Sequence, residues 1–442
     1  WIIFIKYADL YDRYESLVKK IKENKLKSLQ SKLDIQIKKS KSSFWYLVLS
    51  VIFFFFALTS KENVVLAPLL FGVVYFILKP SKVFEVISKI WPFSIAYLLY
   101  FPLRINALGE FAFTKDQSHY ILNPLNGVDL MTCISTAFKI AYIYISKTFI
   151  PYNLTASYDY NHVSLVKYPW ASWQSIVGIL LISLLILLAL KKKGNSHVVK
   201  VGAVSFLISY LIISKLFITK GILMGERLMF FPSLGIVIIV GWVLSKLYKA
   251  NKLLGIISIS SIIIIYSAVL IPRNTVWMTP QGFFEQMVKD SPRSVQAHSA
   301  LARGYFTDGR LNDAKREAEI GYSIYPKHSP LLNVLGKIAY IQENYDKSVN
   351  YFKSAIDNQP GDFGNYENNY FYALNLAKLD RCDQALEHIS DRLKMHPEDS
   401  EIKMVVAACL YKGRKTEEAL SEENNWVPGI SREERLKVLE EF

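Results

Sequence analysis

Residues 253–272 read LLGIISISSIIIIYSAVLIP, a run without a single charged side chain. A helix of about 20 apolar residues is long enough to cross the hydrocarbon core of a bilayer. The chain changes character at this point, because residues 1–272 hold 30 Lys and Arg against 12 Asp and Glu, whereas residues 273–442 hold 22 against 26. The run therefore predicts the last membrane helix of one domain and the start of a different one.

Upstream of this run, the sequence contains further apolar stretches of membrane length. Their approximate bounds are 44–60, 64–79, 174–190, 198–219 and 228–249. Two weaker stretches are 90–103, which is short, and 133–150, which carries two lysines. Because 51% of the 442 residues are hydrophobic, these patterns predict an all-α fold with a multi-spanning helical membrane domain over residues 1–272.

The net charge of +14 is concentrated in short segments between the apolar runs. Nine lysines lie between Lys19 and Lys41, and further clusters are Lys191–Lys193 and Lys246–Lys252. This distribution is typical of cytoplasmic loops, so we expect no nucleic-acid partner. With these segments inside, residues 104–173 lie outside, 133–150 is an interfacial or re-entrant helix, and everything after Pro272 is extracytoplasmic.

The tail repeats a pattern anchored on Pro326, Pro360 and Pro397, with spacings of 34 and 37 residues. This is the period of tetratricopeptide (TPR) helix pairs, in which small residues recur where two helices approach closely. We predict a linker over 273–293, roughly three and a half TPR units over 294–425, and a C-terminal helix or tail over 426–442. The second half of the chain is thus expected to be a TPR α-solenoid.

Several kinds of chemistry find no support in the sequence. Cys133, Cys382 and Cys409 show no metal-ligand spacing. No P-loop, GxSxG, HExxH or dinucleotide-binding motif occurs. We therefore expect neither a metal nor a bound cofactor.

Polar residues between the apolar runs, outside the lysine-rich segments, all fall on the predicted outer face. Charges at the end of a membrane helix are costly unless they pair or meet a polar ligand. Taken singly, each also fits a solvated turn or a side chain that reaches toward lipid phosphate. Together they suit a ligand with an anionic head and an apolar tail. The candidates are Lys61, Glu62, Arg104, Asn123, Asp159, Tyr160, Glu226 and Arg227.

The order of these segments resembles a known family. SKEN at 60–63, Arg104 followed by NPL at 123–125, FIPYNLTASYDYN at 149–161 and GERLMFFPSLG at 225–235 all precede the repeats. This arrangement is similar to the transmembrane and TPR repeat-containing (TMTC) O-mannosyltransferases and their prokaryotic relatives. The resemblance implies a GT-C glycosyltransferase that moves a sugar, typically mannose, from a polyprenyl phosphate to Ser/Thr hydroxyls of proteins.

The resemblance also implies roles for the candidates. Lys61, Arg104 and Arg227 would neutralise the departing lipid phosphate, Glu62 and Glu226 would orient those cations or bind sugar hydroxyls, and Asp159 and Tyr160 would line the vestibule. The TPR groove would present the acceptor polypeptide. The essential acidic pair of this family lies in the first outer loop, so we expect an N-terminally truncated chain whose general base stands upstream of Trp1.

We expect an integral, multi-pass protein of the plasma or inner membrane, or of the endoplasmic reticulum in a eukaryote. Two other functions fit the same sequence. One is a non-catalytic membrane anchor that displays a TPR scaffold, which leaves the outer charged clusters unexplained. The other is a ligase or polymerase of lipid-linked glycans, which differs from the first hypothesis in its acceptor.

Overall fold

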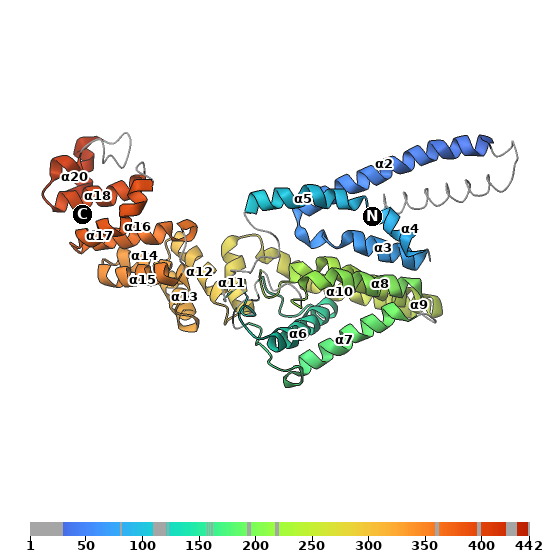
Figure 1. Ribbon diagram of the computed structural model, residues 1–442. Helices are drawn as coiled ribbons and strands as arrows, with labels where there is room; N and C mark the ends of the chain where they lie inside the picture. The colour runs from blue at the N-terminus through green and yellow to red at the C-terminus, as the bar shows by residue number, and fades with distance from the viewer. Residues whose placement is uncertain are drawn as a thin grey trace. The chain divides into compact units, whose positions relative to one another are not determined.

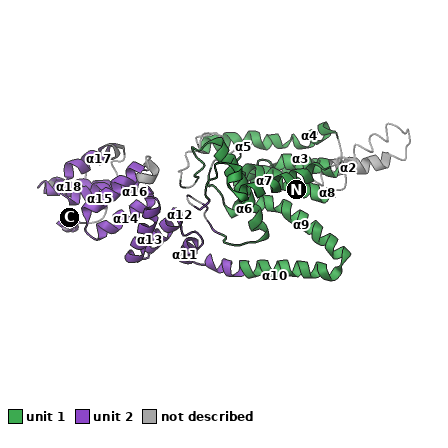
Figure 2. Cartoon of the chain, turned by 90° about the horizontal axis from the view of Figure 1, so that it is seen from below, with its two compact units in different colours: residues 1–154, 164–269 green, residues 155–163, 270–442 purple. Residues whose placement is uncertain are grey.

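In the computed structural model, the residues described are 30–79, 82–108, 121, 123–156, 158, 160, 162–191, 196–216, 221–358, 362–395, 399–420 and 431–440. Every regular element among them is helical, so the predicted all-α fold class is confirmed. The chain divides into two compact units, the first made of Trp1–Leu154 and Ser164–Val269, the second of Thr155–Val163 and Leu270–Phe442 (Figure 2).

The first unit contains the helices from α2 to most of α10 (Figure 1). Its elements are α2 (Gln30–Ser60), η2 (Glu62–Val64), α3 (Ala67–Leu78), α4 (Val83–Ile90), α5 (Phe93–Leu108), α6 (Leu130–Phe149), η3 (Pro169–Ala171), α7 (Trp173–Leu190), α8 (His197–Ile213), η4 (Glu226–Met229), α9 (Phe230–Ala250) and most of α10 (Lys252–Val276).

Three stretches in the described part of the chain are helices long and apolar enough to cross a membrane. They are Trp173–Leu190, Glu226–Ala250 and Lys252–Val276, and the pair formed by α4 and α5, bent by 48°, adds a fourth if it is one span. The predicted span at 64–79 differs, because α3 has only 12 helical residues. At 1.5 Å per residue it extends roughly 18 Å, short of a hydrocarbon core of about 30 Å.

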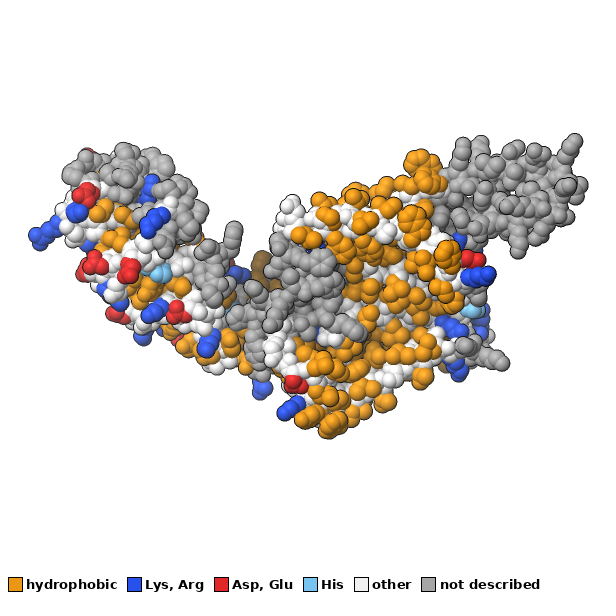
Figure 3. All heavy atoms as spheres, viewed as in Figure 1, with side chains coloured by type: hydrophobic (Ala, Val, Ile, Leu, Met, Phe, Trp, Pro, Cys, Tyr) orange, Lys and Arg blue, Asp and Glu red, His pale blue; other side chains and the backbone are white. Residues whose placement is uncertain are grey.

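The outward-facing side chains of the first unit are those of a lipid-facing surface. Leu180, Ile264 and Phe230 expose 62%, 66% and 82% of their surface. Figure 3 shows hydrophobic side chains covering most of the visible described face of this unit, whereas cations and carboxylates are mixed over the second unit. Apolar exposure on this scale is costly in water, and it identifies an integral membrane protein.

Glycines let the apolar helices of the first unit approach closely. A Cβ on Gly178 of α7 would lie 1.9 Å from the carbonyl oxygen of Phe138 in α6. Gly202 of α8 and Gly235 of α9 face each other in the same way, since a Cβ on Gly235 would lie 2.4 Å from the Gly202 carbonyl oxygen. Small residues at helix contacts are a general solution to packing in membranes, where association depends on close van der Waals contact.

The second unit is a stack of antiparallel helix pairs. These pairs follow α11 (Pro280–Asp290), which lies within the predicted linker. The pairs are α12 (Val295–Thr307) with α13 (Leu311–Ile324), α14 (Ser329–Ile341) with α15 (Tyr345–Asn358), α16 (Asp362–Lys378) with α17 (Cys382–Met395), and α18 (Ser400–Lys412) with the short α19 (Thr416–Ala419). Helix α20 (Arg432–Glu440) is the last described element.

The turn inside each pair repeats one backbone feature. Gly309, Glu343, Asp380 and Arg414 have positive φ angles of 74°, 58°, 59° and 62°, and they stand 34, 37 and 34 residues apart. A left-handed residue is a common way to end a helix because it satisfies the last carbonyls. Its recurrence with the period of the prolines confirms the predicted TPR α-solenoid.

Candidate functional site

The segment just before α9 is held in place by the hydroxyl of Tyr144. Tyr144 of α6 is buried, its hydroxyl donates to the Gly225 carbonyl at 3.2 Å, and it accepts from the Gly225 amide at 2.9 Å. Both backbone groups of Gly225 are therefore held by the same oxygen. These two bonds fix the backbone position directly before Glu226 and Arg227.

Apolar residues around this point add to that rigidity. Leu223 and Met224 are fully buried just before Gly225, and the ring of Tyr210 from α8 packs edge-on against Tyr144, with centroids 6.2 Å apart. Glu226 is half-buried and Arg227 is exposed. A carboxylate in the first helical turn is favoured by the partial positive charge of a helix N-terminus, so the position suits Glu226, while Arg227 is available to a ligand from outside.

The SKEN turn connects α2 to α3. Lys61 is exposed directly after α2, and Glu62 opens η2; the side chain of Glu62 lies outside the described residues. Tyr97 of α5 holds this turn by donating its hydroxyl to the Val65 carbonyl. Helix α8 contacts η2, and its Tyr210 packs against Tyr144, the residue that holds Gly225.

Arg104 lies two turns further along α5 than Tyr97. Its Nη1 donates to the hydroxyl of Tyr100 at 2.9 Å, and its side chain is half-buried. Tyr97, Tyr100 and Arg104 are spaced by three and four residues and so share one face of the helix. This face packs on α2 through a cluster that includes Phe54 and Phe93.

Asn123 has a structural role in the turn before α6. It is fully buried, and its Oδ1 accepts from the Leu125 amide at 3.2 Å, which is a local side-chain turn of the kind asparagine favours. A ligand-binding role for Asn123 stays a prediction, since the structure brings no other candidate into the same turn among the residues described.

Lysines in α6 bind the chain that follows it. Lys139 is buried, with Nζ 2.9 Å from the Ser164 carbonyl oxygen and 2.6 Å from its Oγ. Lys147 donates to the carbonyls of Tyr152 and Asn153 at 2.7 and 2.6 Å. The sequence suggested that these lysines mark an interfacial helix, but the structure gives them partners inside the protein.

The remaining two candidates belong to the second unit. Asp159 lies outside the described residues. Tyr160 is half-buried, with its ring 5.6 Å from that of Tyr325. In the same segment, the Thr155 hydroxyl is 2.9 Å from that of Ser291, and both are buried. Thr155 and Tyr160 therefore pack on residues at the ends of α11 and α13.

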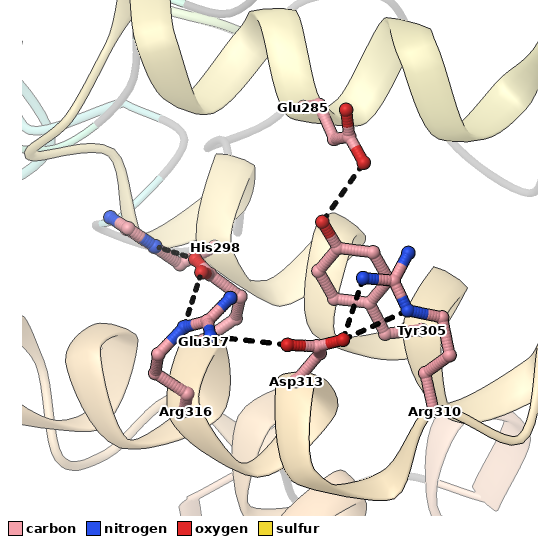
Figure 4. Close-up of polar contacts among 7 residues, drawn as sticks. All are labelled: Glu285, His298, Tyr305, Arg310, Asp313, Arg316 and Glu317. Carbon is pink, nitrogen blue, oxygen red and sulfur yellow. Dashed lines mark hydrogen bonds and ion pairs between the residues drawn. The ribbon is translucent and has the colours of Figure 1, made fainter.

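A polar network ties together the first helices of this stack (Figure 4). The Tyr305 hydroxyl donates to Glu285 at 3.0 Å, and His298 Nδ1 lies 2.9 Å from Glu317. Arg316 reaches Asp313 and Glu317 at 3.1 and 3.5 Å. The contacts of Tyr305 and His298 join α12 to α11 and α13, whereas the partners of Arg316 lie on its own helix, so we assign this cluster to packing of α11, α12 and α13.

Sequence reasoning missed Tyr144 and Lys139 as positioning residues. Nothing in the local pattern distinguishes Tyr144 from the other aromatic residues of the apolar run 133–150. By sequence alone, the lysines of this run indicate only that the helix lies at the membrane surface. Among the described residues, no group of three or more His, Cys, Asp and Glu is arranged to hold a metal ion.

Comparison with known proteins gives a consistent but partial match. No protein-family model matches the sequence. The human protein O-mannosyl-transferase TMTC1 is 26% identical over 197 residues, which cover 42% of this chain and 22% of that protein. The protein O-mannosyl-transferase F38B6.6 of Caenorhabditis elegans is 23% identical over 167 residues, covering 38% and 24%. The chain thus spans about a fifth to a quarter of the length of these relatives.

Among solved structures, the similar ones are helical-repeat proteins. YrrB, described as a TPR protein with an unusual peptide-binding site, has 16% identity and a TM-score of 0.32, and it covers 44% of this chain and 97% of its own. Yeast Tom70 has 14% identity and a TM-score of 0.30, covering 98% and 95%. The solenoid assignment itself rests on the helix pairs and turns described above. By sequence, the chain is thus similar over about 40% of its length to protein O-mannosyl-transferases, among them human TMTC1.

Proposed function

We propose that this chain belongs to a GT-C membrane glycosyltransferase that moves a sugar, with mannose the first candidate, from a polyprenyl phosphate to Ser/Thr hydroxyls of proteins. The observation that carries the proposal is the double hydrogen bond from Tyr144 to Gly225. It fixes the start of a membrane-length helix, with one half-buried carboxylate and one exposed guanidinium directly after it. The relatedness to protein O-mannosyl-transferases supports the same function.

The chemistry requires groups that stabilise a lipid phosphate as it leaves. Charge accumulates on that phosphate in the transition state, and preorganised cations stabilise it more strongly than they stabilise the ground state. Arg227 offers a planar donor set that matches phosphate oxygens, and Lys61 and Arg104 are the further candidates. Tyr144 acts through the backbone, and it is therefore a positioning residue.

The acceptor polypeptide is proposed to bind the TPR stack on the extracytoplasmic side. The first helices of three successive pairs meet at Lys337 of α14, which lies over the rings of Phe306 and Phe371, at 5.7 and 5.6 Å, and pairs with Glu367 of α16. Aromatic faces beside hydrogen-bonding groups suit an extended peptide. The lysine-rich segments between spans support the extracytoplasmic orientation.

The test is transfer of labelled sugar by membranes that contain the full-length protein. Removing a charge-assisted contact costs about 1.5–3 kcal/mol, so we expect Arg227→Ala to slow transfer roughly tenfold to a hundredfold, with Glu62→Ala also reduced. Lys246→Ala, at the opposite end of α9, is the matched control and should transfer normally. Tyr144→Phe should lower kcat with KM for the donor little changed.

Undiminished transfer in both Arg227→Ala and Glu62→Ala would refute the assignment of the site. No transfer by the wild-type protein, with any polyprenyl-phosphate sugar, would instead favour the non-catalytic TPR scaffold.

A further inference from the structure

Two thiols meet where the third helix pair joins the fourth. Cys382 is the first residue of α17, and Cys409 lies in the last turn of α18. These consecutive helices run antiparallel and are in contact, which brings the start of one against the end of the other. Lys412 independently fixes this register, because its Nζ lies 2.9 Å from Asp380 Oδ1, in the turn directly before α17.

The two side chains belong to one packed cluster. Cys409 is 5% exposed within the core shared by the third and fourth pairs, and Cys382 packs against that core from its edge. Both thiols therefore lie at the same core, between the start of α17 and the end of α18. No metal-ligand group surrounds them among the described residues. Two thiols that share one core in this way are placed to close to a disulfide.

We propose that Cys382 and Cys409 are a redox pair that closes to a disulfide and links the fourth, shortened TPR unit to the third. The oxidant is a small or protein disulfide. Cys382 as thiolate attacks one sulfur of that disulfide and releases a thiol, and Cys409, losing its proton, then displaces the second thiol. Two cysteine thiols and one disulfide thus become one intramolecular disulfide and two thiols.

The order of attack follows from exposure. Burial, together with the hydrogen bond to Cys382, raises the pKa of the Cys409 thiol, so Cys409 is a poor first nucleophile. Cys382 is half-buried and reachable from solvent. Closure matters most for α18, because its partner α19 spans only Thr416–Ala419. This inference is independent of the catalytic proposal.

The experiment uses the full chain in detergent, reduced and then equilibrated with mixtures of reduced and oxidised glutathione. After acid quenching, alkylation and digestion, mass spectrometry should find the Cys382 and Cys409 peptides linked. In Cys409→Ser, glutathione should stay on Cys382, and in Cys382→Ser, Cys409 should remain reduced. Cys133→Ser, whose thiol lies in α6, is the control and should close as the wild type does.

The linked chain should also unfold at a higher temperature than the reduced chain, a difference that both Ser variants lose. The proposal is overturned if Cys382 of the wild type keeps its bound glutathione and forms no disulfide with Cys409. It is also overturned if both wild-type thiols are still alkylated at the ratio of oxidised to reduced glutathione that modifies Cys382 in Cys409→Ser. Failure of Cys382 to take up glutathione in Cys409→Ser would equally overturn it, because the Cys382 thiol would then be inaccessible to an external disulfide.

Discussion

At the scale of single residues, the protein uses tyrosine hydroxyls to hold neighbouring segments together. Tyr144 holds both polar groups of Gly225, Tyr97 holds the Val65 carbonyl, and Tyr305 holds Glu285 across the first helices of the repeat stack. A phenol combines a large apolar body with one donor and one acceptor. It can therefore fill a core and still satisfy a buried peptide group, whose desolvation would otherwise cost about 1–3 kcal/mol.

The Glu285 contact leads to a pH-dependent prediction. Hydrogen bonds from Gln281 and then Tyr305 lower the pKa of Glu285 below its ordinary value of 4.5. A carboxylate with a lowered folded-state pKa contributes stability above its unfolded pKa and loses it as the pH falls through the folded value. We expect Tyr305→Phe to unfold at a lower temperature than wild type at neutral pH, and the gap to narrow below pH 4.5.

Circular dichroism melts of both proteins between pH 3 and pH 7 provide the measurement. Tyr322→Phe, an exposed tyrosine of α13, should track the wild type at every pH. A gap between Tyr305→Phe and wild type that stays constant across this range would contradict the account.

At the scale of elements, close helix contacts organise the membrane unit. Gly178 brings α7 onto the backbone of α6, and Gly202 with Gly235 joins α8 to α9. These contacts fix α6, which supplies Tyr144 to Gly225, and α8, which packs Tyr210 against Tyr144. The geometry of the candidate site therefore depends on glycines outside the site itself.

Substitution of Gly178 by alanine tests this dependence. A Cβ 1.9 Å from a backbone carbonyl oxygen forces α6 and α7 apart, and overpacking of this kind typically costs about 1–3 kcal/mol. We expect a lower melting temperature in detergent and slower sugar transfer. Gly241→Ala in α9 is the matched control, because a Cβ there meets nothing within 4 Å. Equal melting temperatures for the two variants would contradict the packing argument.

The sequence predicted most of the elements and little of their contacts. Apolar length identified the α7, α9 and α10 spans, and the proline period identified the repeat, because both signals are local. It did not predict that α3 would be as short as Ala67–Leu78, or that Lys139 would bind Ser164. Those outcomes depend on partners distant in the chain. Arg227 could be proposed from its neighbours in sequence, whereas Tyr144 could be recognised only once Gly225 was found beside it.

At the scale of the whole molecule, the proposal requires the TPR stack to share a compartment with the outer loops. The lysine pattern predicts that arrangement, and it can be tested with single cysteines in a background lacking the three native ones. Ser323→Cys, exposed on α13, should react with an impermeant maleimide in intact cells. Lys191→Cys, after α7, should react only once the membrane is permeabilised. The reverse labelling pattern would place the repeats in the cytoplasm and remove the proposed acceptor groove from the reaction.

The most direct measurement is the fate of the sugar. Purified full-length protein in liposomes is given labelled polyprenyl-phosphate-mannose and a peptide rich in Ser and Thr, next to the same peptide with those residues replaced by Ala. The account predicts label on the first peptide only, attached to hydroxyls and released by β-elimination. Label that stays on the lipid, or that appears on a lipid-linked glycan in place of the peptide, would contradict it.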